Sequence, residues 1–335
     1  MRRFQAHRVD RDLIGIGLLA VALLPVPIVL SASHREVAVR ILLFALLASA
    51  WNLMGGFAGQ FSFGHAAYFG IGAYTTAYLL VNYDISPWLG MAVGAGLAAA
   101  FGVTTAYLAL RYRLRHAYFA LATLAFAEML RLIVVNLDHV NGSLGMQVPR
   151  LAGSSWTMLQ FEPNSANYFY AALCCLIGTL VVIVLYVKSR GGWFTVAIRD
   201  DQDAAESLGI AAMRHLLVVA AISGALTAVG GAFYFQFLFF IDPDLAFGPA
   251  VSVEIFLGAI VGGTGTIWGP VVGAALVVLL GQATTSLVRD APLGLSVLEG
   301  SVGLDLLLFG IVLILITVFL PRGLVGSLVR RRSAR

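Results

Sequence analysis

Apolar runs long enough to cross a membrane follow one another along almost the whole chain. A run of about 20 apolar residues predicts a bilayer-spanning helix, and we place ten of these with short polar connections between them. No polar stretch is long enough for a separate globular domain, so residues 1–335 are predicted to form one all-α transmembrane domain. The predicted spans are 13–30, 37–54, 61–81, 88–110, 116–136, 168–187, 215–240, 251–263, 269–288 and 303–320.

A glycine-rich segment interrupts this pattern early in the chain. Residues 51–74 read WNLMGGFAGQFSFGHAAYFGIGAY, in a region expected at or near membrane depth. Non-helical backbone is tolerated there only where it is buried in protein or lines a water-filled cavity, and broken helices mark the substrate sites of many transporters. Close helix packing is the alternative explanation for the glycines. The polar residues that are candidates for a translocation pathway are Asn52, Gln60, Ser62 and His65.

A second, weaker interruption lies at 258–273, which reads GAIVGGTGTIWGPVVG. Gly265, Gly269 and Gly273 form a GxxxGxxxG ladder, a pattern that lets membrane helices approach closely. Both interruptions join an inward-running span to an outward-running one, yet neither contains Lys or Arg. This composition favours turns that are tucked into the protein.

One predicted span contains two opposite charges. Glu128 and Arg131 lie three residues apart on the span 116–136 and can therefore pair on one helix face. Ionisable residues inside spans are usually paired or functional. An internal ion pair is the favoured interpretation, and a role for Glu128 in gating or substrate contact stays open.

The composition and charge agree with a membrane protein. Hydrophobic residues make up 60% of the chain and charged residues 11%, whereas soluble domains are about 25% charged. The termini and the loops 111–115 and 188–214 hold 16 of the 21 basic residues, and basic segments prefer the cytoplasm. With an even number of spans, both termini are predicted to be cytoplasmic. The net charge of +4 then reports orientation rather than nucleic-acid binding.

The first span has an alternative interpretation as a cleaved signal peptide. Basic residues precede it, and Ser31-Ala32-Ser33 follows it. Its apolar run of about 18 residues is long for a signal peptide. Cleavage would also leave an odd number of spans, so we retain it as a span.

The residue pattern excludes several classes of enzyme. A phosphate-binding loop needs Gly-Lys-Ser/Thr, and the sole lysine, Lys188, follows Val187. The adjacent cysteines, Cys174 and Cys175, point in different directions on a helix, which argues against a disulfide or a metal site. We therefore predict no catalytic residues, no metal ligands and no cofactor bound by this chain.

The most polar segment of the chain is AIRDDQDAAESLGI at 197–210, which holds four of the 17 acids. It lies in a loop predicted to be cytoplasmic. As one helix it would place apolar side chains such as Ile198, Ala205 and Leu208 broadly on one side, and Gly209 would end it. Such a helix suits a groove on a partner protein. A helix lying on the membrane is the alternative, but its acids would be repelled by anionic lipid.

Three of these segments together resemble a known family. IRDDQDAAESLGI, followed by SGALTAVGGAFY at 223–234, looks like the cytoplasmic coupling segment of ABC-importer permeases. NLMGGFAGQFSFGHAAYFGIGAY at 52–74 and GGTGTIWGPVVGA at 262–274 look like two further signatures of the LivM-type permeases of branched-chain amino acid transporters. The combination is more specific than any one motif alone.

The resemblance implies which residues couple the permease to its ATPase. Asp203, Ala204 and Ala205 with Gly209 take the place of the family's Glu-Ala-Ala…Gly signature, with Asp instead of the more usual Glu. Arg199 and Glu206 also fall at positions where the family commonly has charged side chains. The full set of expected coupling residues is Arg199, Asp200, Asp203, Ala204, Ala205, Glu206 and Gly209.

The resemblance also implies a larger assembly. We expect a multi-pass permease subunit of the bacterial inner membrane that works with a second related permease, two cytoplasmic ATPase subunits and a periplasmic or lipid-anchored binding protein. Membrane lipid would surround it, no nucleic acid would bind, and ATP would be used by the partner subunits. Two alternatives stay open. A permease of this family could carry urea, short amides or other amino acids, and a proton-coupled secondary transporter could use Glu128, His65 or Asp305 as a relay.

Overall fold

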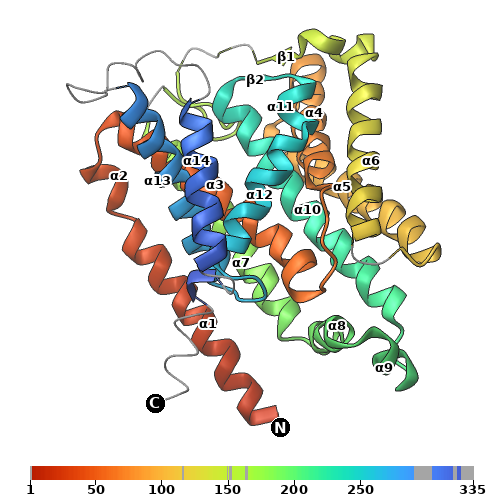
Figure 1. Cartoon of the computed structure of the whole chain (residues 1–335). Helices are drawn as coiled ribbons and strands as arrows, with labels where there is room; N and C mark the ends of the chain where they lie inside the picture. The colour runs from red at the N-terminus through yellow and green to blue at the C-terminus, as the bar shows by residue number, and fades with distance from the viewer. Residues whose placement is uncertain are drawn as a thin grey trace.

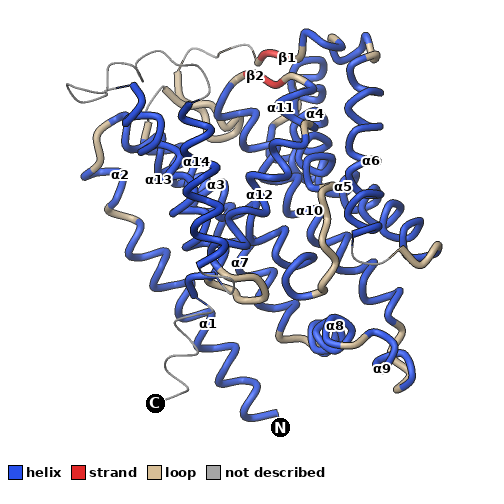
Figure 2. Tube along the Cα trace, viewed as in Figure 1, coloured by secondary structure: helices blue, strands red, loops and turns tan. Residues whose placement is uncertain are grey.

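Long helices make up almost all of the structure, a computed structural model that describes residues 2–114, 117–148, 150, 153–162, 165–289, 304–319 and 323–325 (Figure 1, Figure 2). The long helices are α1 (Arg2–Leu23), α3 (Ala32–Asn52), α4 (His65–Tyr83), α5 (Pro87–Arg111), α6 (Ala117–Val135), α7 (Ala166–Val187), α10 (Ala212–Leu238), α12 (Pro249–Gly262), α13 (Gly269–Arg289) and α14 (Leu304–Phe319). The short helices are α2 (Val26–Val29), α8 (Arg190–Asp200), α9 (Gln202–Ser207) and α11 (Pro243–Phe247).

The long helices correspond one to one with the predicted spans, which confirms an all-α membrane protein with about ten transmembrane helices. Eight helical segments of the described chain are long and apolar enough to cross a membrane. The other two spans are α4, which mixes tyrosine and threonine with its apolar residues, and α14, which has 16 residues.

The first predicted span, 13–30, is wrong in one respect. The helix begins earlier, at Arg2, and is interrupted after Leu23, where α2 starts a new turn at Val26. Pro25 and Pro27 explain the break, because a proline lacks the N–H that an uninterrupted helix needs and its ring clashes with the preceding turn.

The two ends of the bundle carry different structures (Figure 1). The helices α8 and α9 lie at the same end as the start of α1. The opposite end is capped by α11, two 3-10 turns, η2 (Asp138–Val140) and η3 (Gly142–Leu144), and a short antiparallel pair of strands, β1 (Met146–Gln147) and β2 (Phe240–Ile241). If α8 and α9 face the cytoplasm, as the charge pattern predicts, the strands face outward. We use "inner end" and "outer end" in this sense.

Small residues bring α5 and α10 into close contact. A Cβ atom added to Gly102 would lie 2.9 Å from the carbonyl oxygen of Ala220, and one added to Gly224 would lie 2.9 Å from that of Ala98. Each helix thus presents a small residue at two positions four apart, which is the spacing that lets membrane helices approach. Packing accounts for these glycines.

Candidate functional site

The first glycine-rich segment breaks the bundle between α3 and α4. After Asn52 the helix widens into a π-helical turn, η1 (Leu53–Phe57), and residues 58–64 then run without helical structure (Figure 2). The predicted span 61–81 is therefore wrong at its start, since α4 begins only at His65. The prediction of non-helical backbone in this segment is confirmed.

Side chains near the break satisfy part of its backbone. The indole N–H of Trp51 donates to the carbonyl oxygen of Ser62 at 2.8 Å. The hydroxyl oxygen of Ser62 accepts from the backbone N–H of Gly64 at 3.1 Å, and the serine is fully buried. Ser62, a predicted pathway residue, therefore holds the turn into α4.

Two other helices add hydrogen bonds to the break. The hydroxyl of Thr123 on α6 accepts from the N–H of Phe63 at 3.1 Å. The hydroxyl of Ser252 on α12 donates to the carbonyl of Phe63 at 2.5 Å and accepts from the N–H of Ala66 at 2.9 Å. Because buried backbone groups in a membrane must find protein partners, these bonds fix the path of the non-helical segment.

His65 is buried at the start of α4 and joins three helices. Its Nε2 atom lies 2.8 Å from the hydroxyl oxygen of Ser223 on α10, and this hydroxyl donates to the carbonyl of Ala50 on α3 at 2.7 Å. The single hydroxyl hydrogen of Ser223 is thereby used, so Nε2 of His65 is the donor. Nδ1 of His65 has no partner among the described residues. This geometry is that of a hydrogen-bonded packing residue.

Asn52 connects the two glycine-rich breaks. Its side-chain amide donates to the carbonyl of Thr266 at 2.8 Å, and its oxygen accepts from the N–H of Gly265 at 2.8 Å. The exposed fraction of Asn52 is 1%. The first break therefore holds the second by a two-point contact, across more than 200 residues of sequence.

The GxxxGxxxG ladder predicted in the second break is wrong as a feature of one helix. Gly265 lies in the turn between α12 and α13 with a φ of +73°, whereas Gly269 is the first residue of α13. Only Gly269 and Gly273 share that helix, and Gly273 packs against the backbone of Gly258 and Gly262 on α12. The break is a tight turn followed by close helix packing.

Arg199 links the polar segment at the inner end to both breaks. Its Nη1 atom donates to the carbonyl of Gly56 in η1 at 3.2 Å, and its Nε and Nη2 atoms donate to the carboxylate of Asp200 at 3.0 and 2.8 Å. Its side chain also packs against the backbone of Gly59 and Gly265, where any Cβ atom would crowd it. The three motifs of the sequence thus meet at one guanidinium group.

The polar segment forms two helices, so the predicted single helix over 197–210 is wrong. α8 ends at Asp200, and Asp201 has an extended backbone with a φ of −158°. The side chain of Asp201 accepts from the N–H of Ala204 at 3.0 Å and caps the start of α9. Asp is favourable at the N-cap of a helix and less favourable in a helix interior. This preference explains why the helix is interrupted at Asp201.

Gly209 ends α9, as predicted. Its φ is +83°, its N–H donates to the carbonyl of Glu206 at 2.9 Å, and the N–H of Ile210 donates to that of Ala205 at 3.1 Å. These two bonds form a Schellman motif, in which glycine is preferred because of its positive φ.

The expected coupling residues and their apolar neighbours divide between the core and the surface. Ile198 and Ala205 are buried against the protein's own helices. Ala204, Glu206 and Leu208 are exposed, Leu208 by 83%. The exposed residues therefore offer both apolar and acidic contacts, whereas Ala205 anchors α9.

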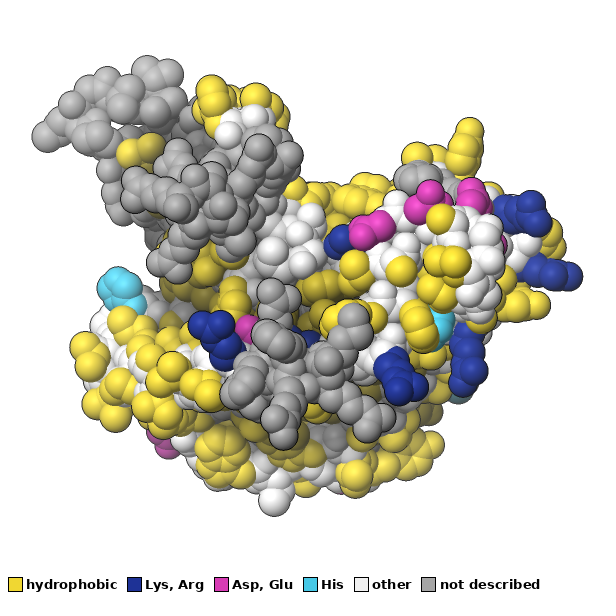
Figure 3. All heavy atoms as spheres, turned by 90° about the horizontal axis from the view of Figure 1, so that it is seen from below, with side chains coloured by type: hydrophobic (Ala, Val, Ile, Leu, Met, Phe, Trp, Pro, Cys, Tyr) yellow, Lys and Arg dark blue, Asp and Glu magenta, His cyan; other side chains and the backbone are white. Residues whose placement is uncertain are grey.

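A cavity of about 290 Å³ lies beside α9. Asp203 and Glu206 line one side of it, and Arg111 and Arg113, from the end of α5 and the residues that follow, line the other. The space-filling view of this end shows acidic, basic and apolar side chains on one face (Figure 3). A partner that binds here would meet both signs of charge.

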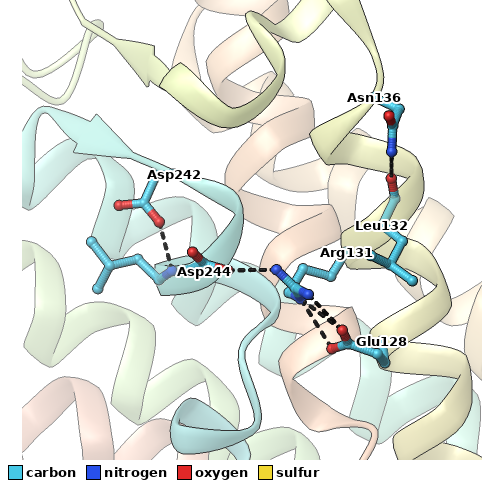
Figure 4. A network of polar contacts seen from close by, with 7 residues as sticks. Glu128, Arg131, Leu132, Asn136, Asp242 and Asp244 are labelled. Atoms are coloured by element: carbon cyan, nitrogen blue, oxygen red, sulfur yellow. Dashed lines mark hydrogen bonds and ion pairs between the residues drawn. The ribbon is translucent and has the colours of Figure 1, made fainter.

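The predicted pair of Glu128 and Arg131 is confirmed, with a further member (Figure 4). Nη2 of Arg131 lies 2.6 Å from the carboxylate of Glu128, and Nη1 lies 2.6 Å from that of Asp244 at the outer end. Arg131 thus ties α6 to α11. The carboxylate of Glu128 is therefore engaged by Arg131, as the ion-pair interpretation predicts.

Gln60 and Asp305 are the last two residues named from the sequence. Gln60 is partly buried, and its side-chain oxygen has no partner among the described residues. The side chain of Asp305 lies outside the described residues.

Thr123 and Ser252, two of the hydroxyls that hold the breaks, lie inside apolar runs and were not singled out by the sequence, whereas Thr266 lies in the second glycine-rich segment. Thr123, Ser252 and Thr266 each satisfy backbone groups of the breaks, the last by donating to Gly263 and accepting from Gly269 at 2.8 and 3.0 Å. A lone Ser or Thr in a span carries no pattern that would identify its partner. Only three-dimensional proximity shows these roles.

Comparisons with known proteins agree with this arrangement. The family described as "Branched-chain amino acid transport system / permease component" matches residues 34–317. The chain is 26% identical to the high-affinity branched-chain amino acid transport system permease protein LivM of Escherichia coli K12 over 333 residues, which covers 93% of this chain and 74% of the relative. It is 25% identical to the permease LivH of the same strain, covering 84% and 91%, and 25% identical to BraD of Pseudomonas aeruginosa with the same coverage. No solved structure matched the chain significantly. With the family match spanning the breaks and the polar segment alike, the chain belongs to the branched-chain amino acid transport permease family.

Proposed function

We propose that this protein is a permease subunit of an ATP-driven importer for branched-chain amino acids. The family match and the names of the relatives support the transport class and the substrate class. The observation that carries the proposal is the hydrogen bond from Arg199 to Gly56, because it connects an exposed inner-end segment to the broken helices inside the bundle. A force applied to α8 and α9 would reach both breaks directly.

The coupling surface would bind an ATPase subunit through α9 and its neighbours. Ala204 and Leu208 supply exposed apolar contacts, and Asp203 and Glu206 supply charge beside Arg111 and Arg113. A short helix with apolar anchors fits a groove on a partner. Closure of the ATPase dimer would push this surface, and rigid-body movement of the attached helices would alternate access to the pathway.

The orientation follows from the loop charges. The inner end carries the basic loops around 111–115 and 188–214, which favour the cytoplasm. An even number of spans places both termini on that side. We assign the protein to the bacterial inner membrane as a multi-pass subunit.

The partners follow from the same proposal. The relatives include two kinds of permease, LivM and LivH, which supports pairing with a second related permease. Two ATPase subunits would supply the energy, and a periplasmic or lipid-anchored binding protein would deliver the amino acid. This chain itself would bind no cofactor, because ATP is used by the ATPase subunits.

Two of the three candidate relay residues are engaged within the protein and give a proton-coupled mechanism no support. Glu128 is engaged by Arg131, and Nε2 of His65 is committed to Ser223. Urea, short amides or other amino acids are the alternative cargoes for a permease of this family, and competition of each with labelled leucine in the uptake assay below separates them.

Uptake of labelled leucine into right-side-out vesicles, with ATP inside and the binding protein outside, tests the function. The complete complex should import leucine in an ATP-dependent manner and continue when an uncoupler removes the proton gradient. Asp203→Lys with Glu206→Lys should abolish uptake while leaving the amount of membrane-inserted permease unchanged. Uptake that stops with the uncoupler, or that survives both lysine substitutions, would contradict the proposal.

A further inference from the structure

A second cavity, of about 610 Å³, lies at the outer end of the bundle. Its size is that of a small-molecule site. It is bounded by α3, α4, α10 and α12, with the turn η3 and strand β2 at its outer edge. The lining residues that matter for its chemistry are Phe44, Phe69, Tyr234, Val251, Asp242 and Glu254.

One wall of the cavity is aromatic and apolar. The rings of Phe69 and Tyr234 lie 5.3 Å apart between centroids and form a packed pair from α4 and α10. Phe44 on α3 and Val251 on α12 extend this apolar surface. Such a wall binds an aliphatic side chain by burial rather than by hydrogen bonds.

Carboxylate groups supply the polar and negatively charged part of the cavity lining. Asp244 also lines the cavity, but its charge is paired with Arg131 at 2.6 Å (Figure 4). One oxygen of Asp242 caps α11 by accepting from the N–H of Leu245 at 2.8 Å. Within the described part of the chain, Glu254 makes no recorded hydrogen bond or salt bridge. Two carboxylates therefore keep acceptor capacity toward the cavity.

The position of Glu254 favours a face of α12 that is turned away from lipid. The residue lies in the second turn of the membrane span α12 and is exposed. Charged side chains in spans face protein or a water-filled cavity, because lipid cannot solvate them. Arg40 on α3, which pairs with Glu36 at 3.5 Å, interacts electrostatically with both Glu254 and Tyr234 but does not line the cavity.

We propose that this outer cavity binds the transported amino acid, with its ammonium group at Glu254 and Asp242 and its aliphatic side chain against Phe44, Phe69 and Tyr234. The inference rests on the proposed function, which it deepens by placing a substrate site. An anionic cargo would be repelled by the two carboxylates, and a purely apolar one would leave them unpaired. A zwitterion with an apolar side chain would place its ammonium group at the carboxylates and its side chain against the aromatic residues.

Leucine uptake by the complete transporter in proteoliposomes tests this site. Glu254→Gln removes the charge and keeps the size, so kcat/KM for leucine should fall by about tenfold or more. Glu254→Asp keeps the charge and should restore part of the loss. Glu162→Gln, on the outer loop away from the cavity, is the matched control and should transport as the wild type does.

The outcomes separate the two proposals. A wild-type complex that imports no leucine would contradict the proposed function. A wild type that imports leucine, together with Glu254→Gln at the wild-type rate, would overturn the site alone.

A labelling experiment keeps the site testable if Glu254→Gln reduces complex assembly. Ala250→Cys lines the cavity and is exposed, and it can be introduced with Cys174→Ser and Cys175→Ser. Leucine should slow its reaction with an impermeant maleimide, whereas 4-methylpentanoate, which lacks the amine, should not. Equal protection by both compounds, or by neither, would refute ammonium recognition in this cavity.

Discussion

The first break and the α8–α9 segment are both irregular in structure, yet they are held in very different ways. The break is surrounded by protein, and its backbone is bonded by side chains from α3, α6 and α12. The α8–α9 segment is exposed over most of its surface, and its bonds are largely internal caps. Its hydrogen bond to the breaks comes from Arg199.

Solvent explains the difference. Backbone groups at membrane depth have no water to bond, so each must be paired within the protein. Backbone groups at the inner end can bond to water and need fewer protein partners. In the proposed function, the break would stay rigid and the α8–α9 segment would move under a partner, and Arg199 joins the two regions. The following substitutions test this division.

The largest effect is expected from Gly209→Pro. Proline cannot adopt the φ of +83° and lacks the N–H that bonds to Glu206, so the end of α9 would be lost. Leucine uptake should be abolished, while the level of inserted permease, measured by quantitative blotting of membranes, stays unchanged. Gly209→Asn is the control, since Asn tolerates a positive φ, and it should retain most uptake. Equal activity of both variants would contradict a coupling role for α9.

The next effect is expected from Asn52→Ala, in the rigid region. The substitution leaves the N–H of Gly265 and the carbonyl of Thr266 unpaired, at about 1–3 kcal/mol for each buried group. The thermal unfolding temperature of the detergent-purified protein should fall clearly, and uptake should fall with it.

The control for that variant is Asn136→Ala. Asn136 is exposed just after the end of α6, and its side-chain amide donates to the carbonyl of Leu132 in that helix at 2.7 Å (Figure 4). Its loss should leave the unfolding temperature nearly unchanged. If Asn52→Ala is equally harmless, the link between the two breaks does not stabilise the fold.

The smallest effect on stability is expected from Arg199→Gln, at the junction. The ion pair with Asp200 is partly exposed, and such pairs contribute about 0–1 kcal/mol. The unfolding temperature should therefore change little. The amount of leucine imported per ATP hydrolysed should fall several-fold, because a residue that links two sites changes their coupling free energy by about 0.5–2 kcal/mol. Arg190→Gln removes the same charge from the same helix as a control. A parallel loss in both variants would show a general charge effect rather than a link.

The sequence predicted the spans and the breaks well because their signals are local and strong. Apolar runs mark the helices, and glycines mark the interruptions. It failed where a residue's role depends on one particular side-chain contact, whether local or distant. From the sequence, Asp201 was placed inside a helix, and the structure shows that it caps α9 through Ala204. Asn52 was one polar residue among several, and the structure shows that it binds the N–H of Gly265. Spacing alone carries no record of such contacts.

The hydrogen bonds of the first break have a consequence for how the chain is made. The segment 58–64 leaves the ribosome well before Thr123, Ser223 and Ser252, whose hydroxyls anchor it and the start of α4. Until α12 has been synthesised, the carbonyl of Phe63 lacks its native partner. An early part of the chain therefore reaches its final path late. A ribosome stalled before residue 252 would hold a chain whose earlier helices are inserted but whose segment 58–64 still lacks its hydrogen bond from Ser252.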